Sequence, residues 1–96
     1  DGILVFSVGG GNAKKNISSN IVKALQYAQE MGSTITGIVG KDGGFTKESG
    51  NAVVVVPTIN QNHITPITEG FQALIWHLLV SHPKLQVNPT KWESTK

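Results

Sequence analysis

The chain contains no cysteine, no arginine and no apolar stretch long enough to span a membrane. The lack of cysteine excludes disulfides, thiolate chemistry and cysteine-type zinc sites. It also suits a reducing compartment, so we expect a cytoplasmic protein without membrane contact. All 8 basic residues are lysines, the formal net charge is +2, and aromatic residues make up 6% of the chain. This weak, dispersed positive charge argues against nucleic acid as a partner.

The chain is short and begins abruptly. Its 96 residues allow one small domain with a modest core. Asp1 and Gly2 lead directly into an apolar run at residues 3–8, and a strand of that kind needs neighbours on both faces. We therefore expect the sequence to be the later portion of a longer protein, with a trimmed N-terminus as the alternative.

Three apolar, β-branched segments predict the strands of a sheet. They cover residues 3–8, 34–39 and 52–56, and none alternates with polar residues. Continuous apolar strands are typical of a parallel sheet that is covered on both faces. A helix between the first two strands completes a strand–helix–strand unit, in which the right-handed crossover makes the strands parallel. The sequence thus predicts an open α/β sheet, although three strands are few for one.

Residues 20–31 predict the first helix. Its apolar side chains recur at helical spacing along one face, at Ile21, Ala24, Leu25, Ala28 and Met31. Ser18 or Ser19 can cap the N-terminus of this helix. Gly32 stands where a helix end favours left-handed backbone.

A second helix is predicted over residues 65–81, with Thr65 as the N-cap and Pro66 in the first helical position. His82, which precedes a proline, ends it.

Residues 1–84 therefore form the predicted domain. Residues 85–96 are polar and unpatterned, and we expect a tail or an arm docked by Trp92.

The segment FSVGGGN at residues 6–12 places three glycines directly after the first strand. Ordering glycine costs much backbone entropy, so tight packing or close approach of a ligand must offset that loss. At the carboxyl end of a parallel strand, glycines let the backbone approach an anion, and the next helix N-terminus adds partial positive charge. The candidate phosphate-binding residues are Ser7, Gly9, Gly10, Gly11, Asn12, Ser18 and Ser19. Lys14 or Lys15 can assist them, and a purely structural turn is the alternative.

Spacing excludes two common nucleotide motifs. A Walker A loop requires Gly-Lys-Ser/Thr after its four-residue gap, and the dinucleotide fingerprint requires glycine where Lys14 stands. We expect no nucleotide cofactor. A generic nucleotide-binding fold is a weaker alternative, which a nucleotide-induced thermal shift would reveal.

The second predicted helix carries Glu69 and His77 on one flank, about 80° apart around the axis and separated by a rise of roughly 12 Å. They cannot touch, but both can reach one ligand or metal lying over Ala73. The apolar residues on the other side of this helix are Phe71, Leu74, Ile75, Leu78 and Leu79. The structural alternative is a core histidine together with a glutamate that interacts favourably with the helix dipole.

Several segments of the chain carry a resemblance to a known family. They are SxGGGN, the following SSN, TGIVGKDGG, a strand ending in VP, and TEGFQALIWHLL. Taken together, they resemble a SIS domain. This is the phosphosugar-binding fold of sugar isomerases, and the similarity is to the phosphoheptose isomerase branch. It covers residues 2–84. The resemblance implies a three-layer αβα sandwich with a five-stranded, Rossmann-like parallel sheet, of which this chain supplies the second half.

The resemblance also implies roles for residues. The loop after the first strand binds the phosphate of the sugar in the family, although Val8 and Gly9 stand here where family members have hydroxyl residues. His77 falls on the position of an acid/base histidine. Glu69 falls on the position of a glutamine that helps to hold a divalent metal, usually zinc, so Glu69 and His77 are the candidate catalytic and metal-binding residues.

The implied activity is aldose–ketose isomerisation of sedoheptulose 7-phosphate, which feeds heptose synthesis for bacterial lipopolysaccharide. The resemblance also implies a dimer or tetramer with sites between subunits. The family's other essential groups lie in the first half of the domain, so we expect the 96-residue chain alone to be inactive. The alternative is a non-catalytic phosphosugar-binding module of a regulator.

Overall fold

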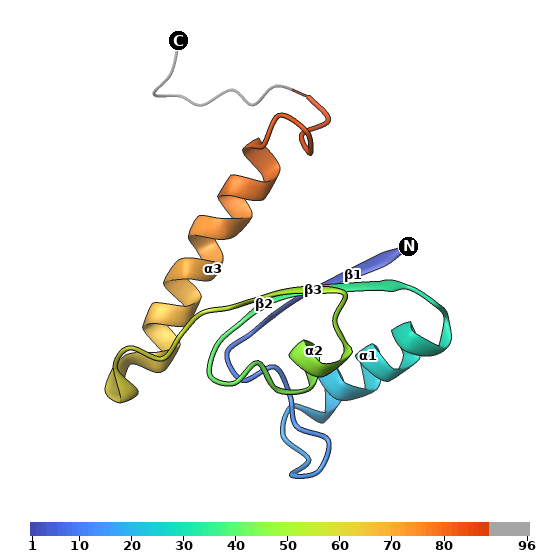
Figure 1. Cartoon of the computed structure of the whole chain (residues 1–96), viewed down its shortest axis with the longest axis vertical. Helices are drawn as coiled ribbons and strands as arrows, with labels where there is room; N and C mark the ends of the chain where they lie inside the picture. Colours follow the sequence, from blue (N-terminus) through green and yellow to red (C-terminus); the bar gives the residue numbers. More distant parts are fainter. Residues whose placement is uncertain (89–96) are drawn as a thin grey trace.

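The computed structural model describes residues 1–88, so Trp92 and most of the predicted tail lie outside the described residues. The elements along the chain are β1 (Gly2–Ser7), α1 (Ser19–Glu30), β2 (Thr34–Val39), α2 (Gly44–Ser49), β3 (Ala52–Val55), the 3₁₀ turn η1 (Gln61–His63) and α3 (Ile64–Ser81) (Figure 1). None of the helices within residues 1–88 is long and apolar enough to cross a membrane.

The three strands form one parallel sheet in the order β1-β2-β3. Ile3 lies opposite Ile35, and Ile38 lies opposite Val54. The predicted strands and their parallel pairing are therefore confirmed. The protein has an α/β architecture compatible with part of a Rossmann-like fold.

One face of the sheet packs against α1, and this contact forms the core. Val5 and Ile35 of the sheet pack against Leu25 and Ala28 of α1, and all four are at most 7% exposed. The predicted apolar face of α1 is partly wrong, because the helix buries Val22 while Met31 is 62% exposed.

The N-terminus of α1 also differs from the prediction. Ser18 is the N-cap residue, but it has left-handed backbone (φ 50°) and makes no side-chain cap hydrogen bond. The preceding loop closes on itself through an antiparallel bridge between Asn12 and Ile17, and the chain leaves that bridge directly into the helix. The left-handed backbone predicted at Gly32 is confirmed (φ 69°).

The six-residue helix α2 was not predicted from the sequence. It is short, begins at a glycine and lacks a run of apolar residues. Its one buried residue, Thr46, is fully buried and donates a hydrogen bond of 2.8 Å from Oγ1 to the carbonyl of Gly10. A tertiary contact, rather than local periodicity, stabilises this turn of helix.

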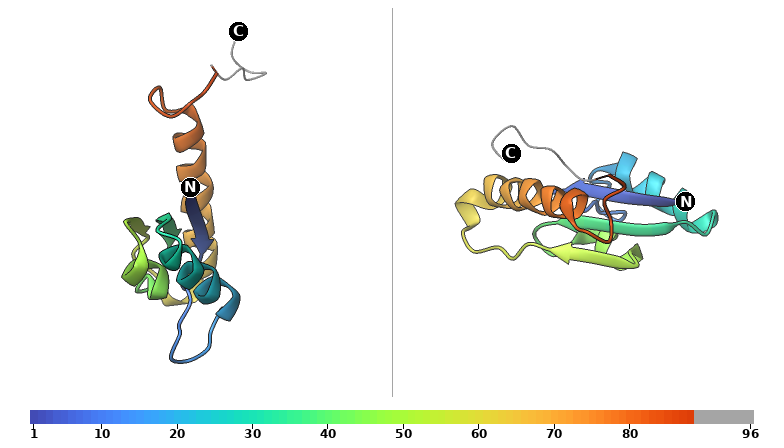
Figure 2. Two further views of the ribbon diagram at one scale, coloured as in Figure 1. Left: turned by 90° about the vertical axis from the view of Figure 1, so that its right-hand side faces the viewer. Right: turned by 90° about the horizontal axis from the view of Figure 1, so that it is seen from above.

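The opposite face of the sheet is only partly covered within residues 1–88. Leu4, Phe6 and Val54 point to this face and are 45%, 40% and 48% exposed. The helix α3 packs on this face. Among the three strands it contacts mainly β2, and it extends well beyond the sheet (Figures 1 and 2). The expectation that both faces are covered is thus not met in the described residues, and the complete three-layer sandwich stays a prediction.

The start of α3 lies slightly earlier than predicted. His63 is its N-cap residue and Ile64 its first residue, so Thr65 is not the cap and Pro66 is third rather than first. The turn η1 leads directly into α3 and is itself capped by Asn60, whose Oδ1 accepts from the Asn62 amide at 2.9 Å. Proline is tolerated here because amides in the first turn of a helix have no partner within the helix.

The end of α3 agrees with the prediction. The helix ends at Ser81, and His82 adopts an extended backbone (ψ 131°). The residue before a proline is restricted to this region, which explains why the helix stops there.

The side of α3 that faces the sheet is polar at its centre. Thr68 and Gln72 are 2% and 6% exposed, whereas Leu74 and Leu78 are 63% and 61% exposed. The apolar side predicted for this helix is therefore wrong in part. Helical periodicity alone could not show which side of a mostly apolar helix meets the sheet.

Candidate functional site

Two glycine turns meet at the carboxyl ends of neighbouring parallel strands. One follows β1 and contains Gly10 and Gly11 (φ 75° and 84°), and the other follows β2 and contains Gly43 and Gly44 (φ 85° and 52°). A Cβ atom on Gly10 would overlap the carbonyl of Gly43, and one on Gly44 would overlap the carbonyls of Gly9 and Gly11. Both the backbone angles and this close approach require glycine.

The glycine loop after β1 also caps the N-terminus of α2. The carbonyl of Gly10 accepts from the Thr46 amide at 3.0 Å, and that of Gly11 accepts from the Phe45 amide at 2.8 Å. Within the loop, the Gly10 amide donates to Ser7 Oγ at 3.0 Å. The structure therefore gives these glycines and Ser7 a packing role, while phosphate binding by them stays a prediction.

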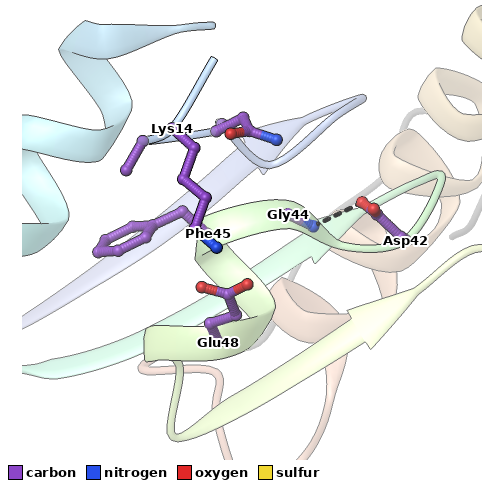
Figure 3. Close-up of a pocket in the computed structure, with 8 residues that line it drawn as sticks. Lys14, Asp42, Gly44, Phe45 and Glu48 are labelled. Carbon is purple, nitrogen blue, oxygen red and sulfur yellow. Dashed lines mark hydrogen bonds between the residues drawn. The ribbon is translucent and has the colours of Figure 1, made fainter. Parts of the chain in front are cut away.

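A pocket of about 190 Å³ opens beside the two glycine turns (Figure 3). Its lining residues come from the loop after β1, the turn after β2 and α2: Gly11, Asn12, Ala13, Lys14, Asp42, Gly44, Phe45 and Glu48. Figure 3 shows Lys14 extending across the pocket toward Glu48, with the Phe45 ring at one side. Asp42 is held in place because its Oδ1 accepts from the Gly44 amide at 3.0 Å.

A second pocket, of about 180 Å³, lies beside the first turns of α1 and shares Asn12 and Ala13 with the first pocket. It is lined by Asn12, Ala13, Asn16, Ser19, Val22, Lys23 and Gln26. Of the predicted phosphate-binding residues, Asn12 and Ser19 are thus brought together here, with Lys23 beside them. Ser18 lies next to this pocket in the chain but does not line it.

Glu69 and His77 lie on α3 and are both exposed. Because Thr68 and Gln72 face the sheet, the helical repeat places His77 on the opposite side of α3, roughly 160° around the axis. Its ring lies 5.9 Å from that of Trp76. Neither Glu69 nor His77 lines the two pockets at the glycine turns. Within residues 1–88, the two parts of the predicted site are therefore separate.

The side chains of residues 1–88 do not complete a metal site. Residues 1–88 contain no group of three or more His, Cys, Asp or Glu side chains that could hold a metal ion. Glu69 and His77 supply two ligands at most, whereas catalytic zinc sites use three from the protein. Zinc stays a prediction from the resemblance.

Gln72 is a residue that sequence reasoning missed. Its Nε2 donates to the carbonyl of Ile38 at 2.7 Å and to that of Ser7 at 3.3 Å, so it joins α3 to the ends of β2 and β1. Thr68 packs against Gly40 at the same place. The polar pair Thr68 and Gln72, one helical turn apart in an apolar helix, was the available signal.

The chain is similar to three curated proteins. It is 34% identical over 64 residues to a phosphoheptose isomerase of Nitratiruptor sp., covering 67% of this chain and 32% of that protein. It is 43% identical over 63 residues to a phosphoheptose isomerase of Trichlorobacter lovleyi, covering 65% of this chain and 30% of that protein. It is also 28% identical over 81 residues to the lincomycin biosynthesis protein LmbN of Streptomyces lincolnensis, covering 83% of this chain and 30% of that protein.

The chain thus spans about a third of the length of the curated relatives it matches. No family model matches the chain. No solved structure matches it either. The comparisons support a relationship to phosphoheptose isomerases over part of their length.

Proposed function

We propose that this chain is part of a sugar-phosphate isomerase of the phosphoheptose type, a SIS-domain protein that converts sedoheptulose 7-phosphate to a heptose 7-phosphate. The similarity to two proteins named phosphoheptose isomerase carries the proposal. The position of the glycine turns supports it, since open α/β sheets bind ligands at the carboxyl ends of their strands.

Converting this ketose to an aldose removes a proton from carbon 1 of the sugar and returns one to carbon 2 through an enediolate. In this proposal His77 moves protons between the two sugar oxygens, because imidazole can both donate and accept one. Glu69 lies two turns earlier on α3 and binds the reacting part of the sugar. Ser18 and Ser19 at the start of α1, with Asn12 and the glycine loop, hold the phosphate.

The orientation of His77 requires a second surface. It points away from the sheet, so the pocket around the reacting carbons must be closed by polypeptide other than the glycine turns described here. We propose that this surface comes from self-association into a dimer or tetramer. The exposed apolar side chains of α3, such as Leu74 and Leu78, are consistent with contacts of this kind.

One observation favours a second candidate, the non-catalytic phosphosugar-binding module. Glu69 and His77 are separated from the pockets at the glycine turns, and a module needs only those pockets. The two candidates differ in whether His77 matters for turnover.

The test replaces His77 with asparagine in the full-length protein that carries this chain. Conversion of sedoheptulose 7-phosphate and binding of the same compound are then measured. An isomerase is expected to lose turnover at least about 100-fold while binding persists. His82→Asn, a histidine at the end of α3, is the matched control and is expected to retain turnover.

Normal turnover in His77→Asn would contradict the catalytic role of this histidine. Binding without turnover in the unaltered protein would support the module. Failure to bind sedoheptulose 7-phosphate would contradict both candidates.

A further inference from the structure

The pocket formed by the loop after β1, the turn after β2 and α2 has a composition that selects among ligands. Its charged lining residues are Lys14, Asp42 and Glu48, which give it one positive and two negative charges. A phosphate monoester brings a charge of about −1.5 to −2 at neutral pH. Two carboxylates facing a single ammonium repel such a group, so this pocket is unsuited to phosphate.

The hydrogen-bonding groups of the pocket suit hydroxyls. Asn12 Oδ1 accepts from the Lys15 amide at 2.9 Å, which directs the carbonyl side of Asn12 to the loop and leaves its NH₂ group as a donor. Asp42 uses Oδ1 for the Gly44 amide, so its second oxygen can accept from a ligand. Lys14 adds donors and Glu48 adds acceptors. Vicinal hydroxyls each donate and accept, and they match such a mixed set.

The shape of the pocket agrees with this chemistry. Phe45 is half-buried and contributes an aromatic ring to one wall (Figure 3). Such a ring can pack against the C–H face of a sugar while hydroxyls reach the charged side chains. The volume of about 190 Å³ is below the ~300–1,000 Å³ of complete small-molecule sites, so it accommodates part of a ligand.

We propose that this pocket is a subsite for the uncharged, hydroxyl-rich end of a sugar, whose phosphate binds elsewhere. That the sugar carries a phosphate is taken from the proposed function, on which this proposal rests. The second pocket presents Ser19 and Lys23 but no carboxylate among its lining residues. The two pockets share Asn12 and Ala13, so one ligand can reach both. Its uncharged end then lies beside the carboxylates of the first pocket, and its phosphate lies in the second.

The experiment is an amide-resolved NMR titration of the chain with three compounds: sedoheptulose, sedoheptulose 7-phosphate and inorganic phosphate. Sedoheptulose is expected to shift the amides of Gly44, Phe45 and Glu48, which line this pocket and do not line the second one. Inorganic phosphate is expected to leave those amides unshifted. Shifts of the pocket amides by phosphate, or no shift by sedoheptulose, would overturn the proposal.

Matched variants test the side chains. Lys14→Met and Glu48→Gln are each expected to weaken sedoheptulose binding at least fivefold, since each loses a charged hydrogen-bonding group. Lys84→Met and Glu30→Gln make the same chemical changes at exposed positions outside the pocket and are expected to bind normally. Equal losses in variants and controls would contradict the assignment. All four positions are exposed, and circular dichroism checks that each variant is folded.

The outcomes distinguish the two proposals. Phosphate shifts at Ser18 and Ser19 without sedoheptulose shifts in the pocket would overturn the subsite and leave the proposed function standing. Sedoheptulose binding in the pocket, with no effect of phosphate at any amide and no gain in affinity from the 7-phosphate, would support the subsite and contradict phosphosugar recognition.

Discussion

The two faces of the sheet are built in different ways. On the α1 and α2 face, backbone packs on backbone where two glycine turns meet, and side chains such as Leu25 and Ile35 are at most 1% exposed. On the α3 face, a single helix is joined to the sheet by the amide of Gln72, and apolar side chains such as Leu74 remain exposed. The first face is a buried hydrophobic core, whereas the second leaves apolar side chains exposed.

This difference shows where each face tolerates change. Closely packed backbone has no adjustable atoms, so an added methyl group must displace the chain itself. A helix held by a few polar contacts can lose one of them and stay close to its place. Substitutions on the first face should therefore be more costly than those on the second.

The largest effect is expected for Gly10→Ala. The new Cβ would overlap the carbonyl of Gly43, and φ is 75°. We expect the free energy of unfolding, measured with urea, to fall by more than about 3 kcal/mol, a large part of the stability of a small domain.

Gly9→Ala is the matched control for this variant. A Cβ on Gly9 meets no atom within 4 Å, so its stability should change by less than about 1 kcal/mol. A comparable loss in both variants would show that the loop does not depend on contact between the two turns.

A smaller effect is expected for Gln72→Leu. This change removes the hydrogen bonds of 2.7 Å and 3.3 Å to the carbonyls of Ile38 and Ser7. We expect a loss of about 1–3 kcal/mol in the free energy of unfolding, with faster hydrogen exchange confined to α3. Gln29→Leu, at an exposed position of α1, should change stability by less than about 0.5 kcal/mol. Faster exchange in α1 and α2 as well would mean that the two faces are not independent.

The aromatic contact on the α3 face is expected to contribute less. Phe6 and Trp76 meet edge-to-face with ring centroids 5.7 Å apart, and both are at least 40% exposed. A double-mutant cycle of Phe6→Leu and Trp76→Leu should give a coupling energy of about 0.5–1 kcal/mol. A coupling near zero would show that this contact does not hold α3 against the sheet.

The smallest effect is expected for Ser18→Ala. A serine N-cap usually contributes about 1 kcal/mol, but Ser18 makes no side-chain cap hydrogen bond. The urea midpoint of this variant should therefore be almost unchanged. Ser18→Gly should raise stability slightly, because φ is 50° and glycine adopts that angle without strain. A full capping loss in Ser18→Ala would show that the serine side chain caps α1 in solution.

Much of the fold could be predicted because its signals are local. The strands are continuous β-branched runs, and the left-handed end of α1 falls on Gly32. Other features could not be predicted, because they depend on contacts between distant segments. Helix α2 depends on Thr46 reaching Gly10, 36 positions away, and the buried side of α3 depends on Gln72 reaching Ile38, 34 positions away.

The same distinction between local and long-range signals applies to the candidate site. The sequence pointed to the glycines after β1 and to Glu69 and His77, but it could not show that they lie apart within residues 1–88. It also could not show that Lys14, Asp42 and Glu48 share one pocket, since they come from three separate segments.

By itself, the sequence determined the parallel strands, the first helix and the left-handed end of that helix at Gly32, because β-branched runs, helical periodicity and the backbone freedom of glycine act over a few residues. Tertiary structure alone decided which side of α3 meets the sheet and which charges share a pocket. Those outcomes depend on how segments more than 30 positions apart come into contact, as the Thr46–Gly10 and Gln72–Ile38 hydrogen bonds do.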